Sequence, residues 1–135
     1  MIELVLGGAR SGKSRYAEQQ AIASGLQVIY IATAEAGDEE MQARIAHHRQ
    51  RRAEHWQTVE QPIHLAQAIA EHAGPQYCIL VDCLTLWLCN VLFDKQGALQ
   101  ADRYQRQNDA LLAALADCPH RVILVSNEIG SGVVA

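Results

Sequence analysis

The feature that most constrains this chain is a glycine-rich segment close to its beginning. Residues 7–14 read Gly-Gly-Ala-Arg-Ser-Gly-Lys-Ser, which matches the pattern G-x-x-x-x-G-K-[ST]. A short apolar run with β-branched members precedes it at residues 2–6, and helix-favouring residues follow it at residues 14–23. A strand, a glycine loop and a helix in that order predict a phosphate-binding loop rather than a simple turn. The chain is therefore expected to bind a nucleotide.

Each residue type in this loop suits a phosphate group. Glycines let consecutive backbone N–H groups curve around phosphate oxygens, and the helix N-terminus adds partial positive charge. Lys13 is expected to reach the β- and γ-phosphates and to act in catalysis, while the Ser14 hydroxyl is expected to bind Mg²⁺. The predicted nucleotide-binding residues of the loop are Gly7, Gly8, Ala9, Arg10, Ser11, Gly12, Lys13 and Ser14.

Length, composition and net charge limit the classes of protein to which this chain can belong. A length of 135 residues, of which 50% are hydrophobic, fits one domain spanning residues 1–135. A net charge of −4 gives no general footprint for nucleic acid, and no apolar run is long enough to span a membrane. Glycines interrupt the first apolar run, so no signal peptide is expected. The four cysteines lack C-x-x-C spacing, which favours buried, reduced thiols in a cytoplasmic protein over a zinc site.

Predicted strands and helices alternate along the chain. Strands are expected at 2–6, 27–33, 77–81 and 122–125, with a short extended segment at 56–60. Helices are expected at 14–23, 38–52, 63–73 (with Pro62 at the first helical position), 84–93 and 101–116. The helix at 84–93 is apolar almost all round, which predicts that it is buried. This alternation predicts a three-layer α/β fold with a mainly parallel sheet, whose ligand lies beyond the carboxyl ends of the strands.

Several polar residues end these strands. Asp82 follows four apolar residues, as the metal-binding acid of a nucleotide-hydrolysing enzyme does, and would hold Mg²⁺ opposite Ser14. The alternative is that Asp82 caps the following helix, because aspartate is a favoured N-cap residue. Thr33 and Glu60 are weaker candidates for lining a pocket, since such residues more often serve turns and caps. The Glu60 carboxylate would suit the N1–H and 2-amino group of guanine.

Two adjacent histidines lie on the helix predicted at 38–52. At about 100° per residue, His48 shares a stripe with Met41 and Ile45, whereas His47 points about 100° away. His48 is therefore expected to face the protein and His47 the solvent. An inward imidazole among arginines could act as a nucleophile toward phosphorus. From the residues alone, a packed histidine bonded to a backbone carbonyl remains the more common alternative.

Taken in order, these motifs resemble one enzyme family. The residues that carry the resemblance are the loop at 7–14, Tyr-Ile-Ala-Thr at 30–33, Glu-Met at 40–41, Arg-Ile-Ala-His-His-Arg at 44–49, His55-Trp56 through Glu60, Asp-Cys-Leu-Thr at 82–85, and Val-Ser-Asn-Glu-Ile-Gly-Ser-Gly at 125–132. The chain is similar over its whole length to the bifunctional adenosylcobinamide kinase / adenosylcobinamide-phosphate guanylyltransferase of cobalamin synthesis. The loop alone is generic, whereas the ordered series is specific.

The resemblance implies two reactions on a RecA-like P-loop nucleoside triphosphatase fold. ATP or GTP would phosphorylate adenosylcobinamide; GTP would then guanylylate a histidine, and the GMP would pass to adenosylcobinamide phosphate. The family nucleophile maps onto His48, with His47 as the neighbouring candidate, and Mg²⁺ would accompany the nucleotide. The resemblance also implies a homotrimer. The further nucleotide contacts that it implies are Ala32, Thr33, Ala34, Arg49, Gln50, Arg51, Arg52, Glu60 and Asp82.

Family members continue beyond the turn at 125–132 with a further segment, so this sequence is short by comparison. That leaves three alternatives of different kinds: the bifunctional enzyme, a simple P-loop small-molecule kinase, and a nucleotide-binding fragment without complete catalysis. A kinase has no need of an inward histidine on the second helix. A GTPase switch is disfavoured because no Asn-Lys-x-Asp guanine signature occurs.

Overall fold

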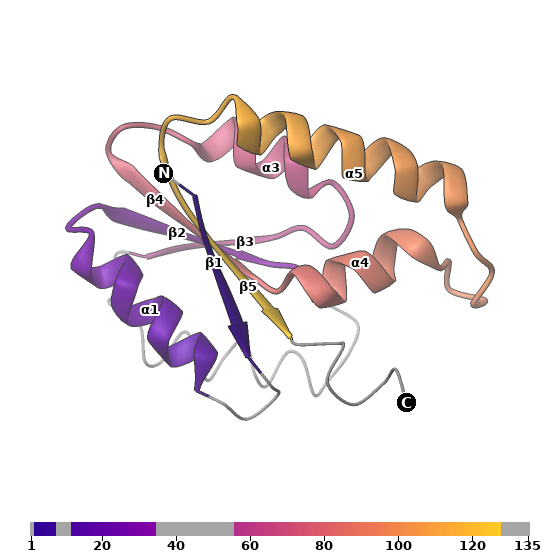
Figure 1. Ribbon diagram of the computed structural model, residues 1–135, viewed down its shortest axis with the longest axis horizontal. Coiled ribbons are helices and arrows are strands. Elements are labelled where there is room, and N and C mark those ends of the chain that lie inside the picture. The colour runs from indigo at the N-terminus through magenta and orange to yellow at the C-terminus, as the bar shows by residue number, and fades with distance from the viewer. Residues whose placement is uncertain (1, 8–11, 35–55, 128–135) are drawn as a thin grey trace.

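The computed structural model describes residues 2–7, 12–34 and 56–127, and its described strands form one parallel sheet (Figure 1). The strands lie in the order β1-β5-β4-β2-β3. Every neighbouring pair is parallel. Their bounds are β1 Ile2–Gly7, β2 Gln27–Ala32, β3 Gln57–Glu60, β4 Tyr77–Asp82 and β5 Arg121–Asn127. The prediction of a parallel sheet is confirmed, and the short extended segment near residue 57 is an edge strand of that sheet.

Helices cover both faces of the sheet, which makes the three-layer arrangement that the alternation predicts. In Figure 1, α1 lies on one side of the strands, while α3, α4 and α5 lie on the other. Their bounds are α1 Lys13–Ala23, α3 Leu65–His72, α4 Leu84–Leu92 and α5 Ala101–Ala116. After α1 the chain turns at Gly25, whose φ of 73° suits a residue without a Cβ.

Alternate residues of the central strands build two separate cores. Along β4, the side chains of Ile79 and Val81 pack with α3, α4 and α5, whereas those of Cys78 and Leu80 pack with α1. This period of two is the expected consequence of the pleat. Because both faces are covered, β2, β4 and β5 read as continuous apolar runs, which is why the sequence predicts them well.

Two helix predictions need correction. The helix expected from Ile63 begins at Leu65, because Gln61 Oε1 accepts hydrogen bonds from the N–H groups of Ile63 and His64 and holds them in a turn. Pro62 is therefore not a helical residue. The helix expected to be buried is α4, yet within it only Trp87 and Val91 are buried. Its apolar sequence covers the core on one side and leaves other apolar side chains partly open.

The cysteine prediction is also wrong in part. All four cysteines are free, but only Cys78 is buried, and Cys89 on α4 is exposed. The helix expected at 38–52 lies outside the described residues. One domain spanning 1–135 stays a prediction, although the described strands share a single sheet.

Candidate functional site

The carboxyl edge of the sheet gathers the polar residues that end the strands. Ala32, the last residue of β2, pairs with Glu60 on one side and with Asp82 on the other. At the far end of the same edge, Gly7 of β1 pairs with Asn127 of β5. The strand register therefore brings Glu60 and Asp82 to the same edge as the glycine loop, as expected for a ligand site in a parallel sheet.

The N-terminus of α1 lies at this edge, directly after the glycine loop. Gly12 precedes the helix with a φ of 81°, a left-handed conformation that glycine adopts without strain. Lys13 is the first residue of α1 and is 9% exposed, while Ser14 is half-buried. Lys13 also borders a hollow of about 440 Å³ between β1 and α1. Gly8, Ala9, Arg10 and Ser11 lie outside the described residues.

Asp82 does not cap the helix that follows it. The N-cap residue of α4 is Cys83, whose Sγ accepts a hydrogen bond from the Leu86 N–H. The carboxylate of Asp82 instead accepts a hydrogen bond from the Tyr30 hydroxyl to its Oδ2, at 2.6 Å. The capping alternative for Asp82 is therefore excluded, and the geometry leaves Oδ1 for another partner.

The backbone that carries Asp82 is fixed by Thr33 and Asn90. The Thr33 hydroxyl donates to the Cys83 carbonyl at 2.8 Å and accepts from the Cys83 N–H at 2.9 Å, and the Thr33 N–H donates to the Asp82 carbonyl. The Asn90 amide on α4 donates to the carbonyls of Thr33 and Pro62. Thr33 is fully buried, so its hydroxyl shapes this turn; its contact with nucleotide stays a prediction.

The charges of Lys13 and Asp82 both act on the thiol of Cys83. Burial raises the pKa of the Cys83 thiol above its ordinary value, hydrogen bonding from the backbone opposes this rise, and the charge of Asp82 adds to it. The charge of Lys13 acts on the same thiol in the opposite direction. The Cys83 thiol is therefore within electrostatic range of both the cation at the start of α1 and the carboxylate at the end of β4.

The side chains at the carboxyl edge are suited to binding Mg²⁺ together with a nucleotide. No group of three or more His, Cys, Asp or Glu side chains that could hold a metal occurs within residues 2–7, 12–34 and 56–127. Mg²⁺ at nucleotide sites needs only one or two protein oxygens, because phosphates and water complete its shell. The hydroxyl of Ser14 and Oδ1 of Asp82 are oxygen donors of the required kind. Their binding of the ion stays a prediction.

The remaining predicted residues divide into two groups. Ala32 and Ala34 are buried and Glu60 is exposed at the end of β3. Outside the described residues lie His47, His48, Arg49, Gln50, Arg51 and Arg52. Sequence reasoning missed Tyr30 and Asn90, which hold Asp82 and its turn. A tyrosine inside an otherwise aliphatic strand was the only available signal for the first.

Comparison with known proteins gives a consistent result. The family model described as cobinamide kinase / cobinamide phosphate guanyltransferase matches residues 3–135. The bifunctional adenosylcobalamin biosynthesis protein CobP of Pseudomonas aeruginosa is 56% identical over 135 residues, which cover 99% of this chain and 75% of that protein. The bifunctional adenosylcobalamin biosynthesis protein CobU of Escherichia coli is 47% identical over 143 residues, covering 99% of this chain and 78% of that protein. The CobU protein of Salmonella typhimurium is 43% identical over the same length.

The relatives are longer than this chain, which matches their N-terminal part. Within the part of the chain that the structure describes, none of the helices has both the length and the apolar character needed to cross a bilayer.

Proposed function

Because this chain belongs to the cobinamide kinase / cobinamide phosphate guanyltransferase family, we propose that it performs both reactions at the carboxyl edge of its sheet. In the first, the hydroxyl of adenosylcobinamide attacks the γ-phosphorus of ATP or GTP, the bond from that phosphorus to the β,γ-bridging oxygen breaks, and ADP or GDP leaves as the hydroxyl proton is released. In the second, GMP from GTP is transferred to adenosylcobinamide phosphate and gives adenosylcobinamide-GDP. The observation that supports this best is the Asp82 carboxylate at the carboxyl edge, one of whose oxygens is used neither by Tyr30 nor by a helix cap.

The residues at the start of α1 would hold the triphosphate. Gly12 and the helix N-terminus present backbone N–H groups, and Lys13 adds a full positive charge beside them. These groups stabilise the negative charge that builds on the leaving phosphates. Bound Mg²⁺ supplies a Lewis acid that neutralises the same phosphates. Asp82 and Ser14 offer the protein oxygens that would fix its position.

The guanylyl transfer would pass through a covalent histidine. An imidazole nitrogen of His48 attacks the α-phosphorus of GTP, the bond to the bridging oxygen breaks, and pyrophosphate leaves. A phosphate oxygen of adenosylcobinamide phosphate then attacks the same phosphorus. The N–P bond breaks, the imidazole is regenerated, and a diphosphate linkage results. Two displacements replace one more difficult transfer. The arginines at 49–52 and Glu60 would contact the nucleotide in the same proposal.

The proposal also covers the cellular location and the oligomeric state of the protein. We propose that the protein acts in the cytoplasm, where nucleoside triphosphates are supplied. A homotrimer is also part of the proposal, since the resemblance implies it. Neither nucleic acid nor a membrane is among the proposed partners.

The covalent step is tested by trapping. The protein is incubated with α-labelled GTP and Mg²⁺, and the acid-labile, base-stable label is mapped to a peptide. We expect label on the 44–49 segment, complete loss of label in His48→Ala, and unchanged GTP affinity. The matched control is His47→Ala, which should retain the label because its ring is expected to face away.

Other outcomes select other functions. Label that persists in His48→Ala and disappears in His47→Ala would move the nucleophile to His47. Phosphorylation of adenosylcobinamide without any labelled protein would indicate a simple kinase. Nucleotide binding without transfer to either acceptor would indicate a binding module.

A further inference from the structure

We propose that Tyr30 is a positioning residue for the metal-bound nucleotide: its phenol holds one oxygen of Asp82 so that the other faces Mg²⁺. The inference rests on the proposed function, because it assigns Asp82 to the metal. Its direct basis is the 2.6 Å hydrogen bond from the Tyr30 hydroxyl to Asp82 Oδ2. Such a short O–H···O⁻ contact is typical of a charge-assisted hydrogen bond.

The tyrosine ring is held rigidly. Tyr30 is 3% exposed and packs in the core beneath α1 with Ala17, Ala21 and Leu80. A ring with only two side-chain torsions, packed on all sides, cannot swing away without opening a cavity. The hydroxyl at its end is therefore a fixed point to which the carboxylate can be tied.

The register of β2 and β4 makes this contact possible. Tyr30 pairs with Leu80, and Ala32, two residues further along the same face of β2, pairs with Asp82. The phenol thus extends toward the carboxyl edge and meets a carboxylate two positions further along the neighbouring strand.

The backbone of Asp82 is fixed, so only its side chain can still rotate. The hydrogen bond from Tyr30 restricts that rotation. The Asp82 carbonyl accepts from the Thr33 N–H, and the Cys83 N–H donates to the Thr33 hydroxyl, so the backbone is fixed on both sides. A free carboxylate on this backbone would still rotate. With Oδ2 bonded to the phenol, Oδ1 keeps one direction.

The choice of donor matters as much as the geometry. A lysine or arginine in this place would neutralise the carboxylate and compete with a cation for it. The phenol is uncharged, so it orients Asp82 while leaving the full negative charge to attract Mg²⁺. This is the arrangement expected of a group that supports a metal ligand, whose loss lowers metal affinity by about 10- to 100-fold.

The test compares nucleotide affinity with and without Mg²⁺ in Tyr30→Phe. Phenylalanine keeps the ring and removes only the hydroxyl. We expect the dissociation constant of metal-free GTP to remain within about twofold, while the Mg²⁺ concentration for half-maximal tightening rises about 10-fold or more. Tyr77→Phe, on the half-buried tyrosine at the other end of β4, is the matched control and should match wild type.

Two further variants separate the possible failures. Asp82→Asn should reduce the Mg²⁺ effect at least as strongly, and Tyr30→Phe added to Asp82→Asn should change it no further, because the tyrosine acts only through Asp82. A normal Mg²⁺ response in Tyr30→Phe, with Asp82→Asn impaired, overturns the inference and leaves the proposed function intact. A normal response in Asp82→Asn removes Asp82 from the metal and overturns both the inference and the assignment of Mg²⁺ to Asp82, whereas the proposed reactions are tested separately by the trapping of labelled GMP. A lower melting temperature alone, with an unchanged Mg²⁺ response, also overturns it.

Discussion

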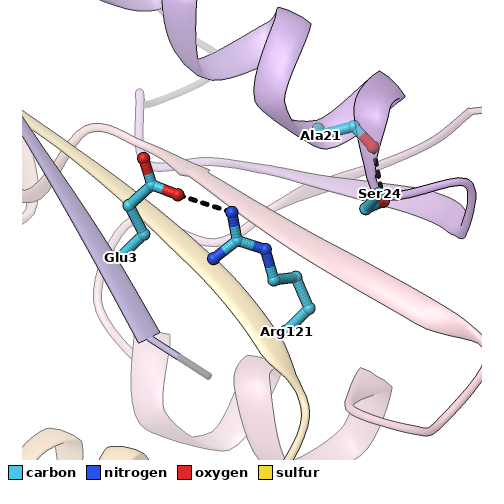
Figure 2. Close-up of polar contacts among 4 residues, drawn as sticks. All are labelled: Glu3, Ala21, Ser24 and Arg121. Carbon is cyan, nitrogen blue, oxygen red and sulfur yellow. Dashed lines mark hydrogen bonds and ion pairs between the residues drawn. The ribbon is translucent and has the colours of Figure 1, made fainter.

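Two polar pairs lie on the same face of the sheet, beneath α1, at opposite ends of the strands. At the amino end, Arg121 of β5 donates from Nη2 to Glu3 Oε1 of β1, and Figure 2 shows this ion pair bridging the two strands. At the carboxyl end, the Tyr30 hydroxyl donates to Asp82. Both pairs join neighbouring strands through a carboxylate, yet they differ in the charge of the donor.

That difference in charge is the one expected between a structural ion pair and the metal-binding carboxylate of the proposed function. The guanidinium of Arg121 neutralises Glu3, so the amino end retains no net charge in this pair. The phenol of Tyr30 leaves Asp82 fully negative at the edge where Lys13 begins α1. A further polar side chain at the amino end also makes a structural contact. Near the ion pair, the Ser24 hydroxyl donates a hydrogen bond to the Ala21 carbonyl at the end of α1 (Figure 2).

The comparison predicts that charge removed at the carboxyl end affects chemistry and not folding. Lys13→Ala should lower the rate of adenosylcobinamide phosphorylation by about 10²- to 10³-fold, because a preorganised positive group at the phosphates is lost. The measurement is steady-state kinase activity, with the urea unfolding midpoint recorded in parallel. Lys95→Ala, an exposed lysine in the turn before α5, is the matched control and should keep full activity. A loss below tenfold in Lys13→Ala would contradict the assignment.

The amino end should show the opposite behaviour. Glu3→Gln should lower the free energy of unfolding by about 1–3 kcal/mol, because Arg121 loses its charged partner while one of its nitrogens, Nη1, is already buried without a hydrogen bond to the described residues. Nucleotide affinity should not change. Urea unfolding measures the first quantity and calorimetric titration with GTP the second. Glu71→Gln on the exposed side of α3 removes the same charge and should alter neither; a matching loss there would show that net charge, not the pair, is responsible.

The smallest expected effect concerns the thiol of Cys78 near this ion pair. Burial raises the pKa of Cys78 above its ordinary value of 9.0; the hydrogen bond with Ser24 and the charge of Arg121 lower it by less, and the charge of Glu3 raises it slightly further. The folded state therefore keeps the thiol proton longer than the unfolded chain does. The corresponding stability is complete below pH 9.0 and is lost as the pH rises from there through the folded pKa.

Removing the thiol should flatten this alkaline loss. In Cys78→Ala the free energy of unfolding should fall less steeply above pH 9.0 than in wild type, by at most one proton, or about 1.4 kcal/mol per pH unit. Exposed Cys89→Ala is the control and should keep the wild-type slope. If the free energy of unfolding falls equally steeply with pH in wild type and in Cys78→Ala, the prediction is wrong, and the Cys78 thiol is more accessible to water than its burial indicates.

Much of the fold and part of the site could be predicted because the signals are local. The apolar runs of β2, β4 and β5, the glycine loop and the helical period of α5 each lie within a few consecutive residues. Prediction failed where contacts with other side chains decide the outcome: Gln61 delays the start of α3 by two residues, and α4 is open on one side despite its apolar sequence.

By itself, the sequence determined the parallel three-layer architecture and the position of the glycine-rich segment between β1 and α1, because spacing and residue type act between near neighbours. Only the tertiary structure decided that Asp82 does not cap a helix. Cys83 is the N-cap residue of α4, and the carboxylate of Asp82 meets Tyr30, 52 residues away along the chain. That contact depends on β2 lying beside β4 in one register, and strand order is set by how the whole sheet packs, which no short segment encodes.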